Sequence, residues 1–253
     1  MPRMTRTRLD TLLVQRGLAP SRERARAIIL AGQVRVDGVI ASKAGVPIGS
    51  DAAVALAHPD HPYVGRGGVK LAHALDAFHV PVAGREALDI GASTGGFTDV
   101  LLRRGASRVV ALDVGRGQLD WRLRTDPRVV VIEGCNARYL TRDDLPGSVD
   151  LVAVDVSFIS LGHILPRIPP LLRPGADVVV LVKPQFEAGR GEVGKKGLVR
   201  DPRVHAQVLD RVTRSALEAS LIRVGLTPSP ITGATGNQEF FLHLKAEQDT
   251  MTL

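Results

Sequence analysis

Two patterns of apolar residues divide the chain. From about residue 66 onward, short apolar runs alternate with segments in which apolar residues recur every three or four positions. The runs are typical of buried strands, and the recurring positions are typical of amphipathic helices. We expect strands at 86–90, 108–113, 128–132, 150–155, 177–183, 221–227 and 239–244, and helices near 69–78, 96–104, 116–123, 161–172 and 202–219. This alternation predicts a doubly wound α/β fold around a mostly parallel sheet.

The first quarter of the chain has a different pattern. Leucines recur at helical spacing in RLDTLLVQRG, and Ser21 is a typical N-cap for a second helix, which Gly32 ends. The stretch QVRVDGVI then alternates apolar and polar residues around an Asp-Gly pair, which predicts a β-hairpin. Two helices and a hairpin indicate a small α+β domain.

A segment rich in proline and glycine, HPDHPYVGRGG, joins these two parts. Such a composition is typical of a linker between domains. We therefore expect a small domain over residues 1–59, a linker over 60–66 and a large domain over 67–253.

Charge and cysteine content narrow the possible partners and compartment. The formal net charge is +7, and residues 1–62 contain nine Lys and Arg against five Asp and Glu. This excess favours a polyanion such as nucleic acid or an anionic membrane. No apolar run reaches the roughly 18 residues of a membrane span, and the histidines lack the spacing of a metal site. The single cysteine, Cys135, fits a reducing cytoplasm, so we expect a cytoplasmic protein with no metal and no membrane span.

A glycine-rich turn follows the first strand of the large domain, in ALDIGASTGGFTDVLLRRGA. Gly91, Gly95 and Gly96 allow a ligand close to the backbone at a helix N-terminus. The spacing matches neither a dinucleotide fingerprint nor a phosphate loop. Asp89, before the glycines, would repel a pyrophosphate but suits a cationic ligand. Asp113, at the end of the next strand, can accept both hydroxyls of a ribose, although both acids could instead be ordinary loop caps.

Four charged residues stand where a core would not place them. Asp155 and Lys183 each end an apolar strand, Lys70 follows the Arg-Gly-Gly turn, and Glu239 precedes the last strand. Ends of parallel strands share one edge of a sheet, and neighbouring strands lie about 4.8 Å apart, so Asp155 and Lys183 can reach each other. A lysine at the exit of a buried strand is costly unless a partner or a task keeps it there.

Several motifs resemble those of known families. The stretch RLDTLLVQRGLAPSRERARAIILAGQVRVDG resembles the S4-like RNA-binding domain of ribosomal proteins. The ordered motifs RGGVKL, DIGASTGGFT, DVGRGQL, DVSFISL, LVKPQFE and GNQEFFL resemble the TlyA family of ribosomal RNA 2′-O-methyltransferases, once labelled haemolysins, whose catalytic domain is FtsJ-like. The resemblance covers roughly residues 5 to 246. One departure is HPYV in the linker, where some members carry Arg-x-Trp-Val.

The resemblance implies a Rossmann-like class I methyltransferase with a seven-stranded, mostly parallel sheet and an N-terminal S4-like domain. It implies S-adenosylmethionine as cofactor and the ribose of an rRNA cytidine as substrate. The implied catalytic tetrad is Lys70, Asp155, Lys183 and Glu239, in which Lys183 lies nearest the 2′-hydroxyl as base or as stabiliser of the alkoxide. The implied cofactor residues are Asp89, Gly91, Ser93, Thr94, Gly95, Gly96, Phe97, Asp113, Asn136 and Asp155.

The resemblance also implies that ribosomal RNA or a ribosomal subunit is the partner. The candidate RNA contacts are arginines, which bind phosphates of structured RNA: Arg8, Arg22, Arg24, Arg26, Arg35 and Arg66. Two other functions stay open at this point. One is a non-catalytic RNA-binding or ribosome-assembly factor, and the other is the membrane-lytic protein that the older label suggests. The sequence does not indicate an oligomeric state.

Overall fold

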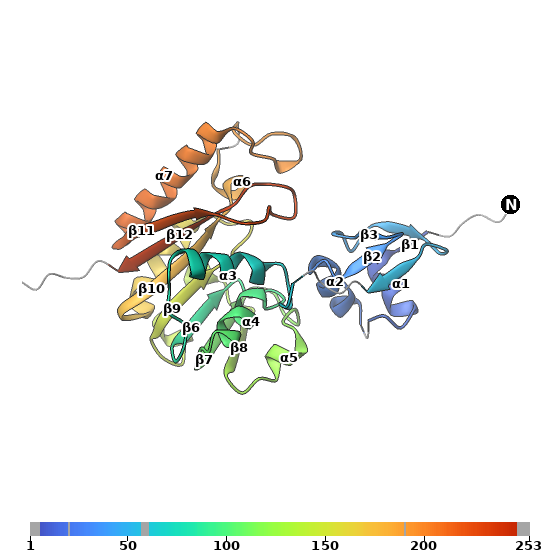
Figure 1. Ribbon diagram of the computed structural model, residues 1–253, viewed down its shortest axis with the longest axis horizontal. Coiled ribbons are helices and arrows are strands. Elements are labelled where there is room, and N and C mark those ends of the chain that lie inside the picture. Colours follow the sequence, from blue (N-terminus) through green and yellow to red (C-terminus); the bar gives the residue numbers. More distant parts are fainter. Residues whose placement is uncertain (1–5, 20, 57–60, 190, 247–253) are drawn as a thin grey trace, which may run out of the picture.

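The computed structural model describes residues 6–19, 21–56, 61–189 and 191–246, and Figure 1 shows a small N-terminal part beside a larger α/β part. The expected domain boundary at residues 59 and 60 lies outside the described residues. So does the polar tail from residue 247 onward.

The N-terminal part consists of two helices and short antiparallel strands. Its elements are β1 (Arg6–Arg8), α1 (Leu9–Gln15), α2 (Arg22–Leu30), β2 (Val34–Val36), β3 (Val39–Ile40), β4 (Pro47–Gly49) and β5 (Val54–Leu56). The Ser21 hydroxyl accepts the backbone N–H of Arg24 at 3.1 Å, as expected for an N-cap. Asp37 and Gly38 have φ of 50° and 82°, the left-handed conformation that a two-residue hairpin turn requires. The expected helices and hairpin are therefore confirmed.

The large part is built on one sheet whose strand order is β11-β12-β10-β9-β6-β7-β8. Its strands are β6 (Glu86–Ile90), β7 (Arg108–Asp113), β8 (Val129–Glu133), β9 (Val149–Val154), β10 (Leu172–Val182), β11 (Leu221–Pro228) and β12 (Phe240–Ala246). Neighbours from β10 to β8 pair in parallel, whereas β12 is antiparallel to both β10 and β11. The predicted seven-stranded, mostly parallel sheet is thus confirmed.

Helices cover both faces of this sheet. They are α3 (Gly67–Ala77), α4 (Gly96–Arg103), α5 (Trp121–Arg124), α6 (Pro184–Glu187) and α7 (Pro202–Glu218). Alternate residues of each central strand enter two separate apolar clusters, one with α3 and α4 and one with α7. Of the described helices, none has the length and apolar character needed to cross a membrane.

Two expected helices differ from the observed structure. The helix expected at 116–123 begins only at Trp121, where the Asp120 side chain caps it. The helix expected at 161–172 is wrong: the segment forms three short 3₁₀ turns, Leu161–His163, Leu165–Arg167 and Pro169–Leu171. Prolines in this segment lack a backbone donor and clash with the preceding turn, so a continuous α-helix cannot form.

A cluster of charged side chains around the buried Asp177 joins β10 to β12. The Asp177 side chain is almost fully buried and contacts Arg85 at 2.6 Å, His243 at 2.7 Å and Lys245 at 3.3 Å. Burial opposes ionisation of Asp177, but hydrogen bonds from His243 and Arg85 and the charge of Lys245 outweigh it. The pKa of Asp177 therefore lies below its ordinary value of 3.8.

We expect Asp177→Asn to lower the free energy of unfolding at pH 7 by about 2 kcal/mol, since it removes the buried carboxylate that Arg85 and Lys245 contact. A depressed carboxyl pKa stabilises the fold above the ordinary value and loses this effect as the pH falls below it. The difference between wild type and variant in urea unfolding should therefore shrink between pH 7 and pH 3. An equal difference at both pH values would contradict the assignment.

Candidate active site

One edge of the large sheet collects most of the candidate residues. The carboxyl ends of β6, β7, β8, β9 and β10 lie at this edge, and so does the amino end of the antiparallel β12. Val182 of β10 pairs with Phe240 of β12, so Lys183 and Glu239 extend from neighbouring strands. Asp155 follows β9 on the other side of β10. The topology explains why residues distant in the sequence meet.

Two lysine–carboxylate pairs lie at this edge. The Lys183 ammonium contacts Asp155 Oδ1 at 2.6 Å and donates to Ser157 Oγ at 2.8 Å. The Lys70 ammonium, from the first turn of α3, donates to Glu239 Oε2 at 2.5 Å. Lys70 and Glu239 are buried, with exposed fractions of 8% and 2%. The structure thus brings all four members of the expected tetrad to one edge, as two pairs.

The glycine-rich turn after β6 lies against the Asp155 backbone. Gly91 and Gly95 have φ of 90° and 95°, which favours glycine. A Cβ at Gly91 would lie 2.3 Å from the Asp155 carbonyl oxygen, and one at Gly95 would lie 2.2 Å from Leu123 Cδ1. A side chain at either position would therefore force the turn away from its neighbours. The open backbone of this turn is suited to holding a ligand closely.

Asp89 lies beneath this turn and is fully buried. It accepts a hydrogen bond from the Thr98 hydroxyl at 2.6 Å, while Oδ1 has no hydrogen-bond partner among the described residues. The pKa of Asp89 is raised to about 7, mainly by burial and also by the nearby charge of Asp155. The hydrogen bond from Thr98 lowers this pKa but does not outweigh burial. Complete burial was not apparent from the sequence, which suggested an acid facing its ligand.

Asp113 and Asn136 continue the same edge towards β8. Asp113 accepts the backbone N–H of Ser93 at 2.8 Å and that of Gly115 at 2.6 Å, which ties the end of β7 to the glycine-rich turn. Asn136 follows β8, and its side-chain oxygen accepts the backbone N–H of Arg138 at 3.1 Å. Both side chains therefore act as caps, the alternative that the sequence left open for Asp113, and Asp113 also borders the turn.

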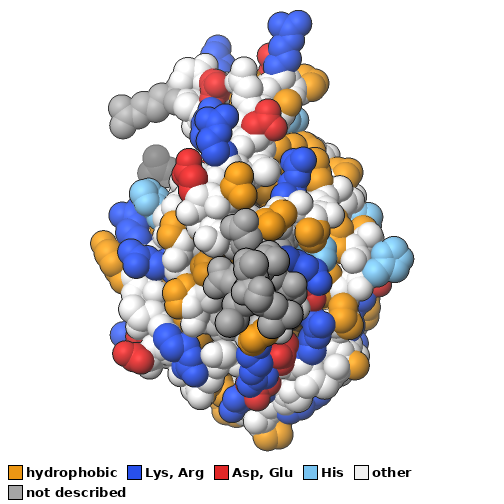
Figure 2. All heavy atoms as spheres, turned by 90° about the vertical axis from the view of Figure 1, so that its left-hand side faces the viewer, with side chains coloured by type: hydrophobic (Ala, Val, Ile, Leu, Met, Phe, Trp, Pro, Cys, Tyr) orange, Lys and Arg blue, Asp and Glu red, His pale blue; other side chains and the backbone are white. Residues whose placement is uncertain are grey.

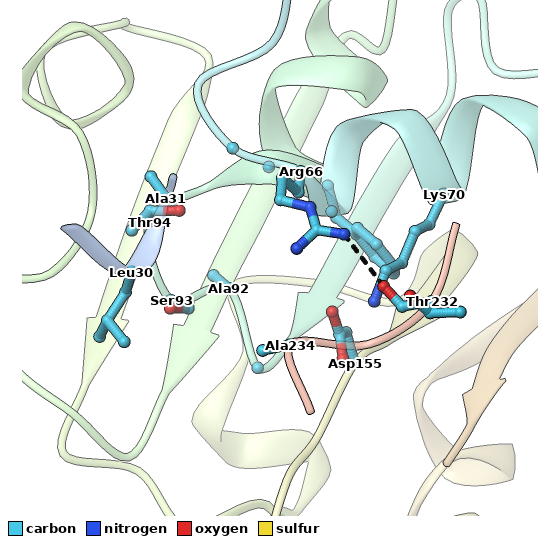
Figure 3. A pocket seen from close by; sticks show the side chains of 15 residues that line it. Leu30, Ala31, Arg66, Lys70, Ala92, Ser93, Thr94, Asp155, Thr232 and Ala234 are labelled. Atoms are coloured by element: carbon cyan, nitrogen blue, oxygen red, sulfur yellow. Dashed lines mark hydrogen bonds between the residues drawn. The ribbon is translucent and has the colours of Figure 1, made fainter. Parts of the chain in front are cut away.

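A pocket extends along this edge, and Figure 3 shows Leu30 and Ala31 at one end of it and Lys70 and Asp155 at the other. The Arg66 guanidinium crosses the pocket and donates to the Thr232 carbonyl at 3.1 Å. The lining residues are Leu30, Ala31, Gly65, Arg66, Gly67, Lys70, Gly91, Ala92, Ser93, Thr94, Gly96, Phe97, Asp155, Thr232 and Ala234. Sequence reasoning missed Leu30, Ala31 and Thr232, because their place depends on how distant segments pack.

An exposed aromatic residue next to Ser157 was also missed. Phe158 is 91% exposed with φ of 64°, and its ring centroid lies 5.0 Å from that of Phe186. Glu187 holds the two loops together, since it accepts the Ser160 hydroxyl at 2.7 Å and the Leu161 N–H at 2.8 Å. An aromatic residue directly after a strand-end acid, in DVSFISL, was the available sequence signal.

The arginines expected to contact RNA differ in their partners within the protein. Figure 2 shows the side of the molecule opposite the N-terminal part, where Lys and Arg side chains of the large part are scattered among apolar and acidic ones. Arg8 and Arg22 contact Asp10, at 2.7 and 3.6 Å. Arg26 is exposed on α2, whereas Arg24 of the same helix contacts Asp120 of the large part at 2.8 Å. Arg35 donates to the Gly38 carbonyl at 3.0 Å.

Comparison with known proteins agrees with this architecture. The FtsJ-like methyltransferase family matches residues 63–246, and the S4 domain family matches residues 7–54. The fold and the site therefore define a methyltransferase with an appended S4 domain. The chain is 50% identical over 245 residues to the 16S/23S rRNA (cytidine-2′-O)-methyltransferase TlyA of Mycobacterium tuberculosis, covering 96% of this chain and 91% of the relative. The chain belongs to the TlyA family.

Solved structures share this fold. A structure from Streptococcus thermophilus that is named as a hemolysin has a TM-score of 0.76 and 43% identity, covering 97% of this chain and 90% of that one. An S-adenosylmethionine-dependent methyltransferase from Mesorhizobium loti has a TM-score of 0.51 and 15% identity, covering 68% of this chain and 95% of that one. The second likeness concerns the fold alone.

We expect Asp89→Asn to change the pH dependence of stability. A carboxyl pKa raised in the folded state stabilises the fold below the ordinary value of 3.8, and this effect is lost as the pH rises through about 7. Relative to wild type, the variant should therefore gain about 2 kcal/mol in unfolding free energy between pH 5 and pH 8. Urea unfolding at both pH values measures the change, and a constant difference would contradict the raised pKa.

Proposed function

We propose that the chain is an S-adenosylmethionine-dependent 2′-O-methyltransferase of ribosomal RNA that acts on a cytidine ribose. The observation that carries the proposal is the pair of lysine–carboxylate contacts, Lys183–Asp155 and Lys70–Glu239, at the sheet edge that also holds the glycine-rich turn. The activity for which the M. tuberculosis relative is named supports the reaction and the substrate.

The turn and its surroundings fit the proposed cofactor. Gly91 and Gly96 of the turn line the pocket, and the buried Asp89 beneath it has an oxygen, Oδ1, with no hydrogen-bond partner among the described residues. Both features support a ligand cradle. When bound, S-adenosylmethionine supplies an activated methyl group on a sulfonium. The turn from Gly91 to Phe97 would hold its methionine part, Asp113 its ribose and Asn136 its adenine. The Asp155 carboxylate favours a cationic ligand.

Lys183 assists the loss of the proton from the 2′-hydroxyl. A ribose hydroxyl is a poor nucleophile at neutral pH, so the enzyme must orient the oxygen and help it lose its proton. Asp155 and Ser157 hold the Lys183 amine in place. From there Lys183 acts either as the base or as the cation that stabilises the developing oxyanion. Glu239 holds Lys70, which places a second cation beside the ribose.

The S4 domain and the loops near Lys183 would bind the RNA. Arginines of the S4 domain contact phosphates, which position the RNA without reading its sequence. Phe158 offers an exposed ring on which a base near the target ribose can stack. A ribosomal subunit in the cytoplasm is the proposed partner. The domain over residues 1–59 would bind RNA, and the domain over 67–253, which a linker joins to it, would carry out the methyl transfer.

We expect Lys183→Ala to reduce methyl transfer to RNA by about a hundredfold or more, the range for loss of a positioned acid–base group. The measurement is incorporation of labelled methyl from S-adenosylmethionine into unmethylated 16S- and 23S-containing subunits and intact ribosomes. The matched control is Lys245→Ala, which removes a lysine at the opposite edge of the sheet. Both variants should retain cooperative thermal unfolding.

Two outcomes would contradict this assignment. Full transfer by folded Lys183→Ala would show that the lysine has no role in the reaction. Absence of label from every RNA substrate with the wild-type protein would sink the methyltransferase proposal and favour a non-catalytic RNA-binding factor.

We expect Arg26→Gln to weaken binding to ribosomal RNA and to reduce the slope of log affinity against log salt by about 0.9, the value for one lost phosphate contact. Filter binding over a range of salt concentrations measures this slope. Arg16→Gln is the matched control, since Arg16 donates to the Ser50 and Ala52 carbonyls within the S4 domain. An unchanged slope for Arg26→Gln would remove Arg26 from the RNA interface.

A further inference from the structure

An ion pair connects the S4 domain to the methyltransferase domain. Arg24 Nη2, on α2, lies 2.8 Å from Asp120 Oδ2, and the side chains are 33% and 7% exposed. Asp120 also accepts from Arg122, whose side chain is 69% exposed, at 3.1 Å. Burial opposes ionisation of Asp120, but the hydrogen bonds from Arg24 and Arg122 outweigh it, so the pKa of Asp120 lies below its ordinary value.

Asp120 is attached directly to the glycine-rich turn. Its backbone N–H donates to the Thr94 carbonyl at 3.1 Å. Its side chain also accepts the backbone N–H of Arg122 at 3.0 Å and so caps α5, the helix that carries Leu123. Leu123 in turn packs against Gly95, since a Cβ at that glycine would meet it at 2.2 Å. A shift of Asp120 would therefore move the turn in two ways, through the hydrogen bond of the Asp120 backbone and through the packing of α5.

The same α2 helix supplies part of the pocket. Leu30 at its end and Ala31 directly after it line the pocket together with Ser93 and Thr94 of the turn (Figure 3). Gln33 adds a contact between the S4 domain and the segment that leads into α3, because its amide donates to the Val64 carbonyl at 3.2 Å. The wall formed by Leu30 and Ala31 is in place only while the S4 domain stays docked.

We propose that Arg24 is a positioning residue for the cofactor: its ion pair with Asp120 holds α2 against the glycine-rich turn, so that the S4 domain forms one wall of the cofactor pocket. This inference rests on the proposed function, because it takes S-adenosylmethionine as the ligand of that pocket. It also assigns Arg24 a task other than the phosphate contact expected from the sequence. Removing either partner lets the wall move away and weakens cofactor binding without touching the tetrad.

The test measures S-adenosylmethionine binding to the full-length protein by calorimetry, without RNA. Arg24→Gln and Asp120→Asn should each raise the Kd by about fivefold to tenfold, the lower part of the range for coupled sites. Asparagine keeps the helix cap and removes only the charge. The double variant should bind no more weakly than either single variant, because the two residues act as one contact.

Two controls separate this role from general damage. Arg122→Gln removes the exposed partner of the same carboxylate within one domain, and it should bind the cofactor like wild type. Arg24→Lys keeps the charge and should recover part of the affinity lost in Arg24→Gln. In methylation assays, the KM for the cofactor should rise in Arg24→Gln while kcat stays unchanged.

Wild-type affinity in folded Arg24→Gln would overturn the inference. So would a loss in Arg122→Gln as large as that in Arg24→Gln, or additive losses in the double variant. These outcomes leave the proposed function intact. If the wild-type protein itself bound no S-adenosylmethionine, the proposed function would fail together with the inference.

Discussion

Each lysine at the ligand-binding edge of the large sheet has its own carboxylate, and this pairing lets charged groups remain in a largely buried site. Lys183 contacts Asp155 at 2.6 Å, and Lys70 contacts Glu239 at 2.5 Å. An unpaired ammonium or carboxylate there would pay a desolvation penalty of several kcal/mol. The pairs do more than neutralise charge, since they also fix where each amine points. The same two ion pairs therefore offset the cost of burying these charges and hold the side chains in position.

The reversed direction of β12 is what makes the second pair possible. In a wholly parallel sheet, the residue before β12 would lie at the opposite edge, far from α3. Because β12 runs antiparallel to β10, Glu239, just before β12, lies at the same edge as Lys183, just after β10. Next to β9, Gly91 lies so close to the Asp155 backbone that any side chain at position 91 would collide with it. Strand direction and one glycine thus bring the pairs and the glycine-rich turn together.

The large sheet and one half of the site could be predicted from local patterns. Apolar runs indicate the strands, and the shared edge of parallel strands indicates that Asp155 and Lys183 meet. The three 3₁₀ turns between Leu161 and Leu171 could not be predicted from apolar spacing alone, because prolines override that spacing. The Arg24–Asp120 pair joins residues 96 positions apart and depends on how two domains dock. Charge and periodicity do not contain that information, and the same holds for the complete burial of Asp89.

The proposed reaction is the transfer of a methyl group, at this edge of the sheet, to a ribose 2′-oxygen of ribosomal RNA. Its most direct test is to label unmethylated ribosomal subunits with the wild-type protein and labelled S-adenosylmethionine, digest the RNA to nucleosides and separate them by chromatography. We expect the label to elute with 2′-O-methylcytidine. Label in a base-methylated nucleoside, or none in RNA, would contradict it.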